Sequence, residues 1–226
     1  RNINYLRVSL TDRCNLRCRY CMPEKGIDKK SHRDILSLED IYEIIQTAVE
    51  MGFSKVRLTG GEPLVRKGVI ELCRSISGLS GVKDFAMTTN GLLLPEMARE
   101  LKAAGLMRLN ISLDTLDPDR YHQITRIGSL DDALAGIAAA EEAGHTYQFD
   151  REAYLPMRTV LERVPELEPV QSDGGVARLY RLPGAKGTVG LISPLSDHFC
   201  SGCNRLRLTA DGCLKPCLHS AREILL

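Results

Sequence analysis

Three cysteines in one short stretch carry the clearest chemical signal in this sequence. Cys14, Cys18 and Cys21 form a C-x3-C-x2-C run that follows the strand-like residues 5–11. α/β proteins place their chemistry at the carboxyl ends of parallel strands, and the run lies at such an end. Three close thiolates suit an iron–sulfur cluster, and a cluster of four irons keeps one iron open for a small ligand. The alternative is a structural zinc knuckle, although zinc sites usually have four protein ligands and C-x2-C pairs.

A second group of cysteines lies near the end of the sequence, and it consists of Cys200, Cys203, Cys213 and Cys217. The first, second and fourth form a C-x2-C-x13-C set, whereas all four together have a spacing that suits a zinc site. Arg205 and Arg207 are two residues apart on an expected strand, so both side chains project to one side. Guanidinium groups match phosphate oxygens and keep their charge, so this side suits a phosphate ligand.

Strand-like and helical stretches alternate through the first 144 residues. Ser37 and Asp40 have the spacing of a helix capping box, and Gly52 ends the apolar stripe of the same helix. The repeated βα order implies a parallel sheet with right-handed crossovers. The expected strands are 5–11, 55–59, 82–89 and 107–113, the expected helices are 38–51, 68–79, 95–104 and 130–143, and antiparallel strands are expected at 176–181 and 188–192.

Each expected parallel strand has one apolar and one polar face, although buried parallel strands are normally apolar on both. Helices must cover the apolar face, so the polar face points into a hollow. Arg7, Lys55 and Arg57 on that face are costly unless an anion lies among them. We therefore expect a hollow partial barrel that holds a ligand with phosphate or carboxylate groups. The polar positions are Arg7, Ser9, Thr11, Lys55, Arg57, Thr59, Thr88, Asn90, Asn110, Ser112 and Asp114.

The composition excludes some classes of function. The 226 residues include 30 basic and 29 acidic ones, and a net charge of +1 gives no field that would recruit nucleic acid or an anionic membrane. No apolar run is long enough to cross a bilayer, and no secretory signal opens the chain. Clustered cysteines in an intracellular protein more often bind metal than form disulfides, so we expect a cytoplasmic metalloprotein.

The C-x3-C-x2-C run, with Tyr20 before its last cysteine, resembles the signature of the radical S-adenosylmethionine (SAM) superfamily. The resemblance implies that Cys14, Cys18 and Cys21 hold a [4Fe–4S] cluster whose open iron chelates SAM. One electron from such a cluster cleaves SAM to methionine and a 5'-deoxyadenosyl radical. The implied fold is an α/β partial TIM-type barrel with a C-terminal extension that carries a second cluster. Gly60-Gly61-Glu62-Pro63 matches a SAM-binding loop of the family, and the implied SAM contacts are Tyr20, Gly61, Glu62 and Ser112.

The second cysteine group and Asn204-Arg205-Leu206-Arg207 resemble the GTP 3',8-cyclase family, whose radical SAM enzymes begin molybdenum cofactor biosynthesis. The resemblance implies conversion of GTP to (8S)-3',8-cyclo-7,8-dihydroguanosine 5'-triphosphate. It also implies a second [4Fe–4S] cluster on Cys200, Cys203 and Cys217, with its open iron at the guanine. No side chain is assigned as catalytic, because the radical arises at the first cluster. The implied GTP contacts are Arg7, Arg57, Thr88, Arg205 and Arg207.

The resemblance covers residues 1–144 and about 197–226, and it fails between them. The family has two further strands there, but residues 145–152 show no strand pattern, which would leave the last expected strand with an unpaired edge. Two βα units occupy on the order of 50 residues. We therefore predict that a segment is missing between Gly144 and His145. The expected regions are a radical SAM barrel over 1–144 and an auxiliary-cluster region over 145–226.

Two other functions stay open at this point. A radical SAM enzyme that matures a protein or peptide would explain both cysteine groups but not Arg205 and Arg207. A zinc-stabilised binding module without catalysis would explain the cysteines alone. For the leading hypothesis, the expected partners are GTP, an electron donor of unidentified kind, a downstream pterin-forming enzyme and a second copy of the chain.

Overall fold

The computed structural model describes residues 3–27, 31, 34–148, 161–171, 178–184, 188–191, 203–217, 220 and 222–226. The chain divides into two compact units. The larger unit comprises residues 4–151 and 205–226, and the smaller unit comprises residues 1–3 and 152–204. The larger unit therefore extends past residue 144, where the sequence predicted a boundary, and it takes in the last strands of the chain.

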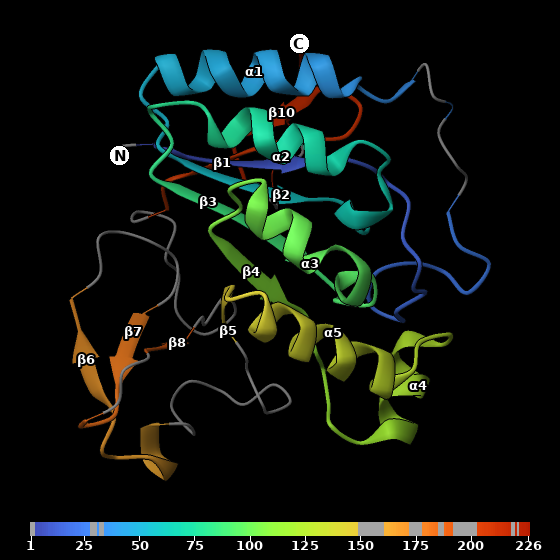
Figure 1. The fold of residues 1–226 in the computed structure, drawn as a ribbon, viewed down its shortest axis with the longest axis vertical. Helices are drawn as coiled ribbons and strands as arrows, with labels where there is room; N and C mark the ends of the chain where they lie inside the picture. Colours follow the sequence, from blue (N-terminus) through green and yellow to red (C-terminus); the bar gives the residue numbers. More distant parts are fainter. Residues whose placement is uncertain are drawn as a thin grey trace. The chain divides into compact units, whose positions relative to one another are not determined.

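A sheet of eight described strands forms the centre of the larger unit (Figure 1), in the order β11-β10-β9-β1-β2-β3-β4-β5. The strands from β9 to β5 run parallel to their neighbours, whereas β10 and β11 continue the sheet in antiparallel pairs. The predicted parallel βα architecture is confirmed. The bounds are β1 (Tyr5–Ser9), β2 (Lys55–Thr59), β3 (Asp84–Thr89), β4 (Arg108–Ile111), β5 (Thr146–Gln148), β9 (Arg205–Leu208), β10 (Cys213–Lys215) and β11 (Ile224–Leu225).

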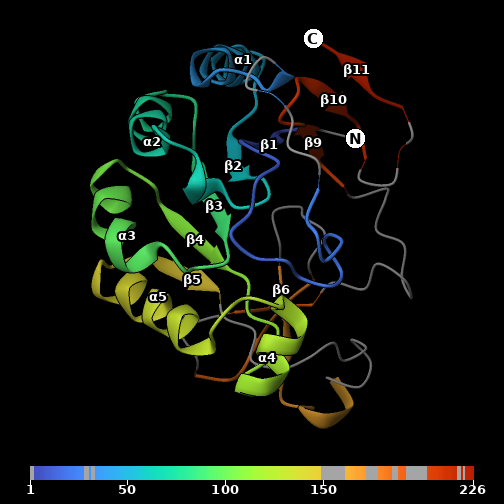
Figure 2. The same ribbon diagram turned by 90° about the vertical axis from the view of Figure 1, so that its right-hand side faces the viewer.

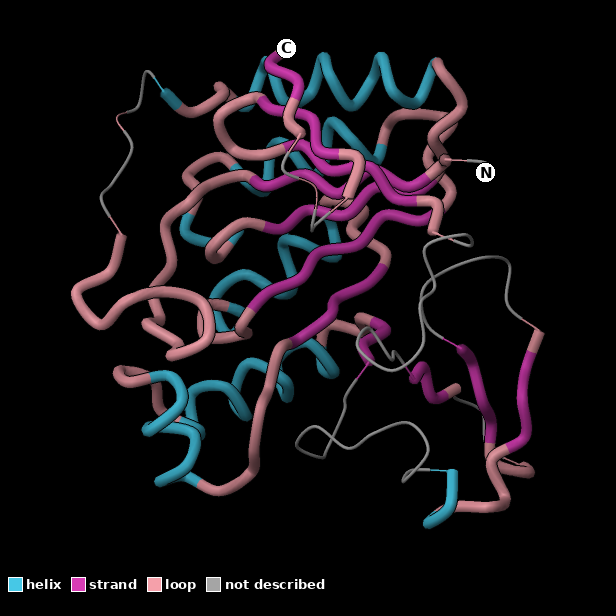
Figure 3. The backbone as a smooth tube through the Cα atoms, turned by 180° about the vertical axis from the view of Figure 1, so that it is seen from behind, coloured by secondary structure: helices cyan, strands magenta, loops and turns pink. Residues whose placement is uncertain are grey.

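Helices line one face of this sheet. Figure 2 shows α1, α2, α3 and α5 in a row beside strands β1 to β5, and Figure 3 shows the strands from the other side, in front of the helices. The capping box of α1 forms as predicted, because Ser37 Oγ accepts from Asp40 N at 3.0 Å and Asp40 Oδ2 accepts from Ser37 N at 3.1 Å. The helices are α1 (Leu38–Glu50), the 3-10 turn η2 (Pro63–Val65), α2 (Val69–Ser77), α3 (Leu94–Ala103), α4 (Pro118–Thr125) and α5 (Leu130–Glu142).

The hydrophobic core lies between this row of helices and the sheet, as the alternation along the strands predicted. Leu6, Val8 and Leu10 of β1 and its extension are at most 1% exposed, and Leu58 and Met87 are fully buried. Full burial of such a side chain stabilises the fold by about 1.5–3 kcal/mol. The core therefore fixes which strand faces point away from the helices, and those are the polar ones.

The chain continues the sheet after α5, which corrects one prediction. Residues 145–152 show no strand pattern in the sequence, yet Thr146–Gln148 forms β5 and pairs with β4 in parallel. A strand of three residues is too short for alternation to reveal it. Gly144 adopts φ +71° after the helix, and its N–H and that of His145 donate to the carbonyls of Glu141 and Ala140. The predicted unpaired edge of β4 is therefore covered.

The smaller unit contains a three-stranded antiparallel sheet among its described residues, which confirms the predicted antiparallel strands. Its order is β6 (Glu168–Val170), β7 (Arg178–Arg181) and β8 (Val189–Leu191). In neither unit do the described residues form a helix with the length and apolar character needed to cross a membrane.

Candidate functional site

The cysteine loop, residues 14–22, follows β1 and rests on the end of α4. Backbone N–H groups of Arg17 and Arg19 donate to the carbonyls of Thr125 and Ile124 at 3.1 and 2.9 Å. Within the loop, the N–H groups of Cys21 and Met22 both donate to the Cys18 carbonyl, at 3.0 and 3.1 Å. The last two cysteines therefore sit on one tight turn, whose position α4 determines. The sequence did not predict α4, although Asp117 caps it and Pro118 opens it.

The three cysteines of this loop line one cavity of about 510 Å³ in the larger unit. The structure thus brings together most of the residues that the sequence predicted for SAM and for the nucleotide. The lining residues are Arg7, Ser9, Cys14, Leu16, Cys18, Tyr20, Cys21, Thr59, Gly60, Gly61, Glu62, Thr88, Thr89, Asn90, Ser112, Arg207, Leu208, Thr209 and Lys215.

The thiols of this cavity fit the donor set of a cluster. Burial is the main cause that raises the pKa of all three thiols, and with smaller contributions from Cys21, Asp114 and Cys14 the pKa of Cys18 rises to about 11. Among the described residues, no three Cys, His, Asp or Glu side chains are grouped closely enough for a single metal ion. Cys14, Cys18 and Cys21 would hold a cluster at the rim of the cavity, and ligation would displace their protons.

The Gly60-Gly61-Glu62 loop packs directly against the chain that leads into the cysteine loop. The N–H groups of Gly61 and Glu62 donate to the carbonyls of Thr11 and Arg13, both at 2.8 Å. A Cβ atom on Gly61 would overlap the Arg13 carbonyl. The absence of a side chain at Gly61 therefore allows the two backbone segments to approach closely.

Glu62 joins this loop to the end of β3. Its side chain is 1% exposed, and Oε1 accepts from Leu64 N at 3.0 Å and from Thr89 Oγ1 at 2.8 Å. Oε2 accepts from Asn90 N at 2.7 Å. Burial raises the pKa of Glu62, although these hydrogen bonds act in the opposite direction. The carboxylate therefore holds three protein groups while it borders the cavity.

Three arginines on neighbouring strands form an arginine row, Arg57, Arg7 and Arg207, that lies across the polar face. The register of β9, β1 and β2 pairs Arg7 with Arg57 on one side and with Arg207 on the other. Strands lie about 4.8 Å apart, so the row spans about 10 Å. Arg7 precedes Ser9, the last residue of β1, by two residues. Measured along the strands, the arginine row therefore lies about 7 Å before the strand ends that lead to the cysteines.

The arginine row is electrostatically unfavourable without a ligand. Burial, and after it the neighbouring arginines, lower the pKa of Arg7 to about 10, and burial also lowers the pKa of Arg57. Within the described residues, neither of these two side chains forms an ion pair. Arg57 donates to Thr88 Oγ1 at 3.4 Å, and its Nε is buried with no partner among the described residues. Cations gathered in this way mark a site for an anion.

Tyr5 lies beside the arginine row and contacts two cations. The guanidinium carbons of Arg57 and Arg205 lie 5.8 and 5.6 Å from the centroid of its ring, within the range of cation–π interactions. The Arg205 Nε and the Tyr5 hydroxyl are both buried without a described partner. Arg57 and Arg205 are not among the residues that line the cavity. Their contacts with Tyr5 hold them next to Arg7 and Arg207, which do line it.

Sequence reasoning missed Lys215 as a cavity residue, whereas it placed Asn90 on the polar face that lines the cavity. Lys215 of β10 pairs in register with Arg207 and forms a salt bridge with Glu223. Asp211-Gly212 between two short alternating stretches is a hairpin signal that could have revealed this register. Asn90 donates from Nδ2 to Asn15 Oδ1 at 2.7 Å and so joins the cysteine loop to β3.

Tyr20 connects the cysteine loop to the chain beyond β4. Its hydroxyl donates to Asp114 Oδ2 at 2.8 Å, and the side chain is 65% exposed. Tyr20 also lines the cavity, so it can form part of the surface for a ligand. Ser112, which the sequence placed near SAM, lines the same cavity.

The predicted second cluster site falls only partly within the described residues. Cys200 lies outside them, Cys203 belongs to the smaller unit, and Cys217 is exposed after β10 in the larger unit. Cys213 is a residue of β10 and pairs in register with Leu225.

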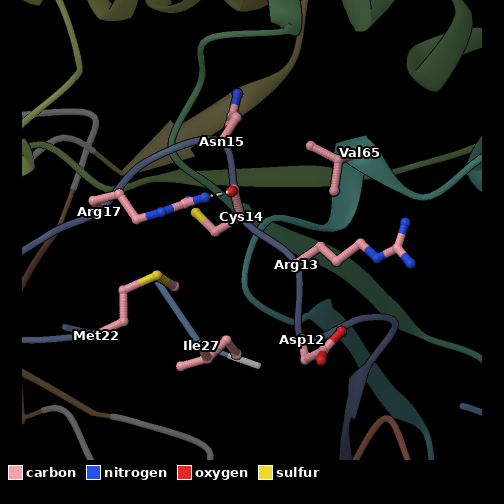
Figure 4. A pocket seen from close by; sticks show the side chains of 8 residues that line it. All are labelled: Asp12, Arg13, Cys14, Asn15, Arg17, Met22, Ile27 and Val65. Carbon is pink, nitrogen blue, oxygen red and sulfur yellow. Dashed lines mark hydrogen bonds between the residues drawn. The ribbon is translucent and has the colours of Figure 1, made fainter. Parts of the chain in front are cut away.

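A second, smaller cavity lies next to the cysteine loop (Figure 4). It measures about 280 Å³, and Cys14 borders it as well as the larger cavity. Arg17 donates from Nη1 to the Cys14 carbonyl at 2.8 Å across this space.

Two family descriptions match this chain. Residues 8–159 match the Radical SAM superfamily, and residues 140–226 match Molybdenum Cofactor Synthesis C. The chain is 48% identical to the GTP 3',8-cyclase of Alkaliphilus metalliredigens over 267 residues, which cover 99% of this chain and 83% of the relative. It is also 48% identical to the GTP 3',8-cyclase of Peptoclostridium acidaminophilum over 269 residues, with the same shares covered.

The fold is also similar to solved structures. SuiB from Streptococcus suis, bound to S-adenosylmethionine, superposes with a TM-score of 0.64 at 15% identity over 99% of this chain and 61% of SuiB. The methylornithine synthase PylB gives 0.51 at 21% identity over 65% of this chain and 44% of PylB. These identities support a shared fold alone. The Alkaliphilus match runs over 267 positions against 226 residues here, so that relative carries at least 41 residues within the matched range that this chain lacks.

Proposed function

Because the chain belongs to the radical SAM superfamily and within it to the GTP 3',8-cyclase family, we propose that its large cavity converts GTP to (8S)-3',8-cyclo-7,8-dihydroguanosine 5'-triphosphate. Enzymes of this superfamily use a [4Fe–4S] cluster and SAM. The protein is thus an enzyme with a role in molybdenum cofactor biosynthesis. The observation that supports the proposal most is that one cavity is bordered by three thiols at its rim and by Arg7 and Arg207 of the arginine row below them.

The rim of the cavity would hold the cluster and SAM. Cys14, Cys18 and Cys21 would ligate the cluster, while Gly61, Glu62, Tyr20 and Ser112 would contact SAM. When bound, this pair would supply a 5'-deoxyadenosyl radical, which takes a hydrogen atom from C3' of the ribose. Addition of the C3' radical to guanine C8 leaves an unpaired electron on the guanine, so one further electron and one proton are needed to reach the 7,8-dihydro product, and the external electron donor would supply that electron. The protein needs no general base for the hydrogen-atom transfer, and its residues orient the reactants and keep water away.

The arginine row would hold the triphosphate. The guanidinium groups of Arg7, Arg57 and Arg207 would form a positively charged surface for phosphate oxygens. A nucleotide whose ribose lies at the rim of the cavity would place its phosphates at this row. Thr88, which accepts from Arg57, would fix the direction of that side chain. Arg205, held by Tyr5, would extend the surface on the same strand face.

A second [4Fe–4S] cluster on Cys200, Cys203 and Cys217 is a further part of the proposal. It is supported by the C-x2-C-x13-C spacing and by the match of residues 140–226 to Molybdenum Cofactor Synthesis C. We also propose that the protein works in the cytoplasm as a homodimer, takes its electron from an external donor and passes its product to a pterin-forming enzyme.

Metal content and cofactor dependence test the proposal. Anaerobically prepared protein should contain about eight iron atoms per chain, and it should cleave SAM when GTP is present. Bound zinc in place of iron would favour the non-catalytic binding module. Cleavage of SAM that does not depend on GTP would favour an enzyme that matures a protein or peptide.

Substitution at the centre of the arginine row tests the nucleotide site. Arg7→Met should weaken GTP binding about tenfold or more, because a charge-assisted hydrogen bond to phosphate is lost. Stability of the ligand-free protein should not fall, because the buried charge and its repulsion are removed. Arg99→Met, at a side chain that is 86% exposed, is the matched control and should change neither quantity. Unchanged GTP affinity in Arg7→Met would show that the nucleotide binds elsewhere.

A further inference from the structure

Arg126 makes an unusual set of contacts with the cysteine loop. It follows α4, and its Nη1 donates to the carbonyl of Arg17 at 2.7 Å and to the carbonyl of Met22 at 3.0 Å. Arg17 immediately precedes Cys18, and Met22 immediately follows Cys21. One guanidinium nitrogen therefore fastens both ends of the segment that carries the second and third thiols.

The backbone of Arg126 is strained. Its φ is +67°, and among the described residues it is the one non-glycine residue with positive φ. This region is unfavourable for any residue with a Cβ atom, and such strain persists where surrounding contacts impose it and clusters at functional sites. A glycine would adopt the same backbone without this cost. The arginine side chain must therefore contribute something that offsets the strain.

The remaining contacts of this region explain why the side chain matters. Backbone bonds from Arg17 and Arg19 to Thr125 and Ile124 fasten the first half of the loop to α4. The bond from Arg126 to Met22 continues this attachment across the turn that follows Cys18. A charged donor to a carbonyl forms a stronger hydrogen bond than a neutral one. The far end of the turn is thereby held at a fixed distance from α4.

We propose that Arg126 is a positioning residue that keeps the thiols of Cys18 and Cys21 in the separation that a cluster requires. The inference rests on the proposed cluster site at the cysteine loop, but it does not depend on the identity of the nucleotide. A cluster ligated by three thiols has one protein bond fewer than a closed site, so its retention depends more on the rigidity of the loop.

Arg126→Gly separates this role from a general role in folding. The substitution relieves the backbone strain and removes the side chain. We therefore expect the thermal stability of the ligand-free protein to be kept or to rise, and the retention of iron to fall. The ligand-free protein should melt at the same temperature as the wild type or higher. Anaerobically reconstituted protein should release iron to a chelator about tenfold faster or more, because charge-assisted hydrogen bonds are lost. Amide exchange should accelerate at residues 17–22, and the spectrum of the reduced cluster in electron paramagnetic resonance should change.

Three further variants and the wild type complete the experiment. Arg126→Ala removes the donor but keeps a Cβ atom and the backbone strain, so it should release iron as fast as Arg126→Gly, and Arg126→Lys should release iron more slowly than either because it keeps a donor. Arg120→Ala removes an exposed cation from the preceding helix, α4, and should behave as the wild type. Iron release at the wild-type rate in Arg126→Gly, or a lower melting temperature of its ligand-free form, would overturn the inference. Wild-type protein that binds no iron at all would instead contradict the proposed function.

Discussion

Glu62 belongs to the proposed SAM-binding loop, and its side chain also stabilises the structure of the protein. Its carboxylate accepts from Leu64, Thr89 and Asn90, and it is almost completely buried. Those three groups belong to the turn after β2 and to the end of β3. This side chain therefore fixes the position of the Gly60-Gly61-Glu62 loop together with the backbone hydrogen bonds of Gly61 and Glu62 to Thr11 and Arg13.

Glu62→Gln should destabilise the ligand-free protein. The amide can still accept at one oxygen, but its NH2 group then faces the N–H of Asn90, so a buried donor loses its acceptor. Such a loss costs about 1–3 kcal/mol of unfolding free energy, which urea denaturation can measure. Glu71→Gln, at an exposed position on α2, is the control and should change stability by less than about 0.5 kcal/mol.

Tyr5 is the second residue with a testable role. Its ring contacts Arg57 and Arg205, so it orients two of the proposed phosphate ligands. Tyr5→Leu should weaken GTP binding by about 1–2 kcal/mol, or roughly five- to thirtyfold, in a calorimetric titration. Tyr5→Phe keeps the ring and is the matched variant, so its affinity should stay near that of the wild type. Equal losses in both variants would show that the hydroxyl, and not the ring, matters.

At the scale of elements, the junction between α5 and β5 depends on a buried histidine. His145 is 5% exposed, its Nε2 donates to the Ala98 carbonyl at 2.9 Å, and its Nδ1 is buried without a described partner. A proton on Nδ1 would have no acceptor. Burial accordingly lowers the pKa of His145 below its ordinary value. The neutral ring therefore joins the start of β5 to α3.

This histidine predicts how stability depends on pH. Because the folded-state pKa is lowered, the unfolded chain takes up the proton first as pH falls below about 6.5. Stability from the neutral ring is present above that pH and is lost as pH falls through the folded-state pKa. The unfolding free energy of His145→Gln should decline less between pH 7 and pH 5 than that of the wild type. The exposed His122 supplies the control variant, His122→Gln, whose decline should match the wild type.

The junction between α5 and β5 is also where we propose that this chain lacks a segment that its relatives have. The Alkaliphilus relative has at least 41 residues that this chain lacks, and we place them between Gly144 and His145, where the family pattern breaks off. Trypsin cuts after Arg126 and Arg151, so an uninterrupted chain releases the peptide 127–151. We expect mass spectrometry of the protein from its natural source to lack this peptide. Its detection would establish that Gly144 and His145 are bonded neighbours.

At the scale of the whole molecule, strand alternation predicted most of the architecture. The apolar faces of the parallel strands were identified correctly because each strand has a core on one side and a hollow on the other. That one pattern also predicted the arginine row, since Arg7 and Arg57 alternate with Val8 and Leu58. The cysteine spacing predicted the loop at the strand ends, where the structure places it.

Other features depend on contacts that the sequence does not display. β5 is too short to show a period, and α4 is an irregularly patterned helix that docks on the cysteine loop through its end. Arg126 was missed because a positive φ at an arginine has no composition signal. Lys215 was missed because its place in the cavity follows from a hairpin register between β9 and β10. In each case the tertiary partner, and not the local residue pattern, determines the role.

The central claim is that the ribose of GTP and the adenosyl group of SAM meet in the one cavity between the cysteine loop and the arginine row. Turnover with GTP that carries deuterium at C3' tests this claim most directly. The account predicts that mass spectrometry finds the deuterium in the 5'-deoxyadenosine product, and that Arg7→Met lowers the yield of labelled product. Deuterium that stays in the nucleotide while SAM is cleaved would contradict the account.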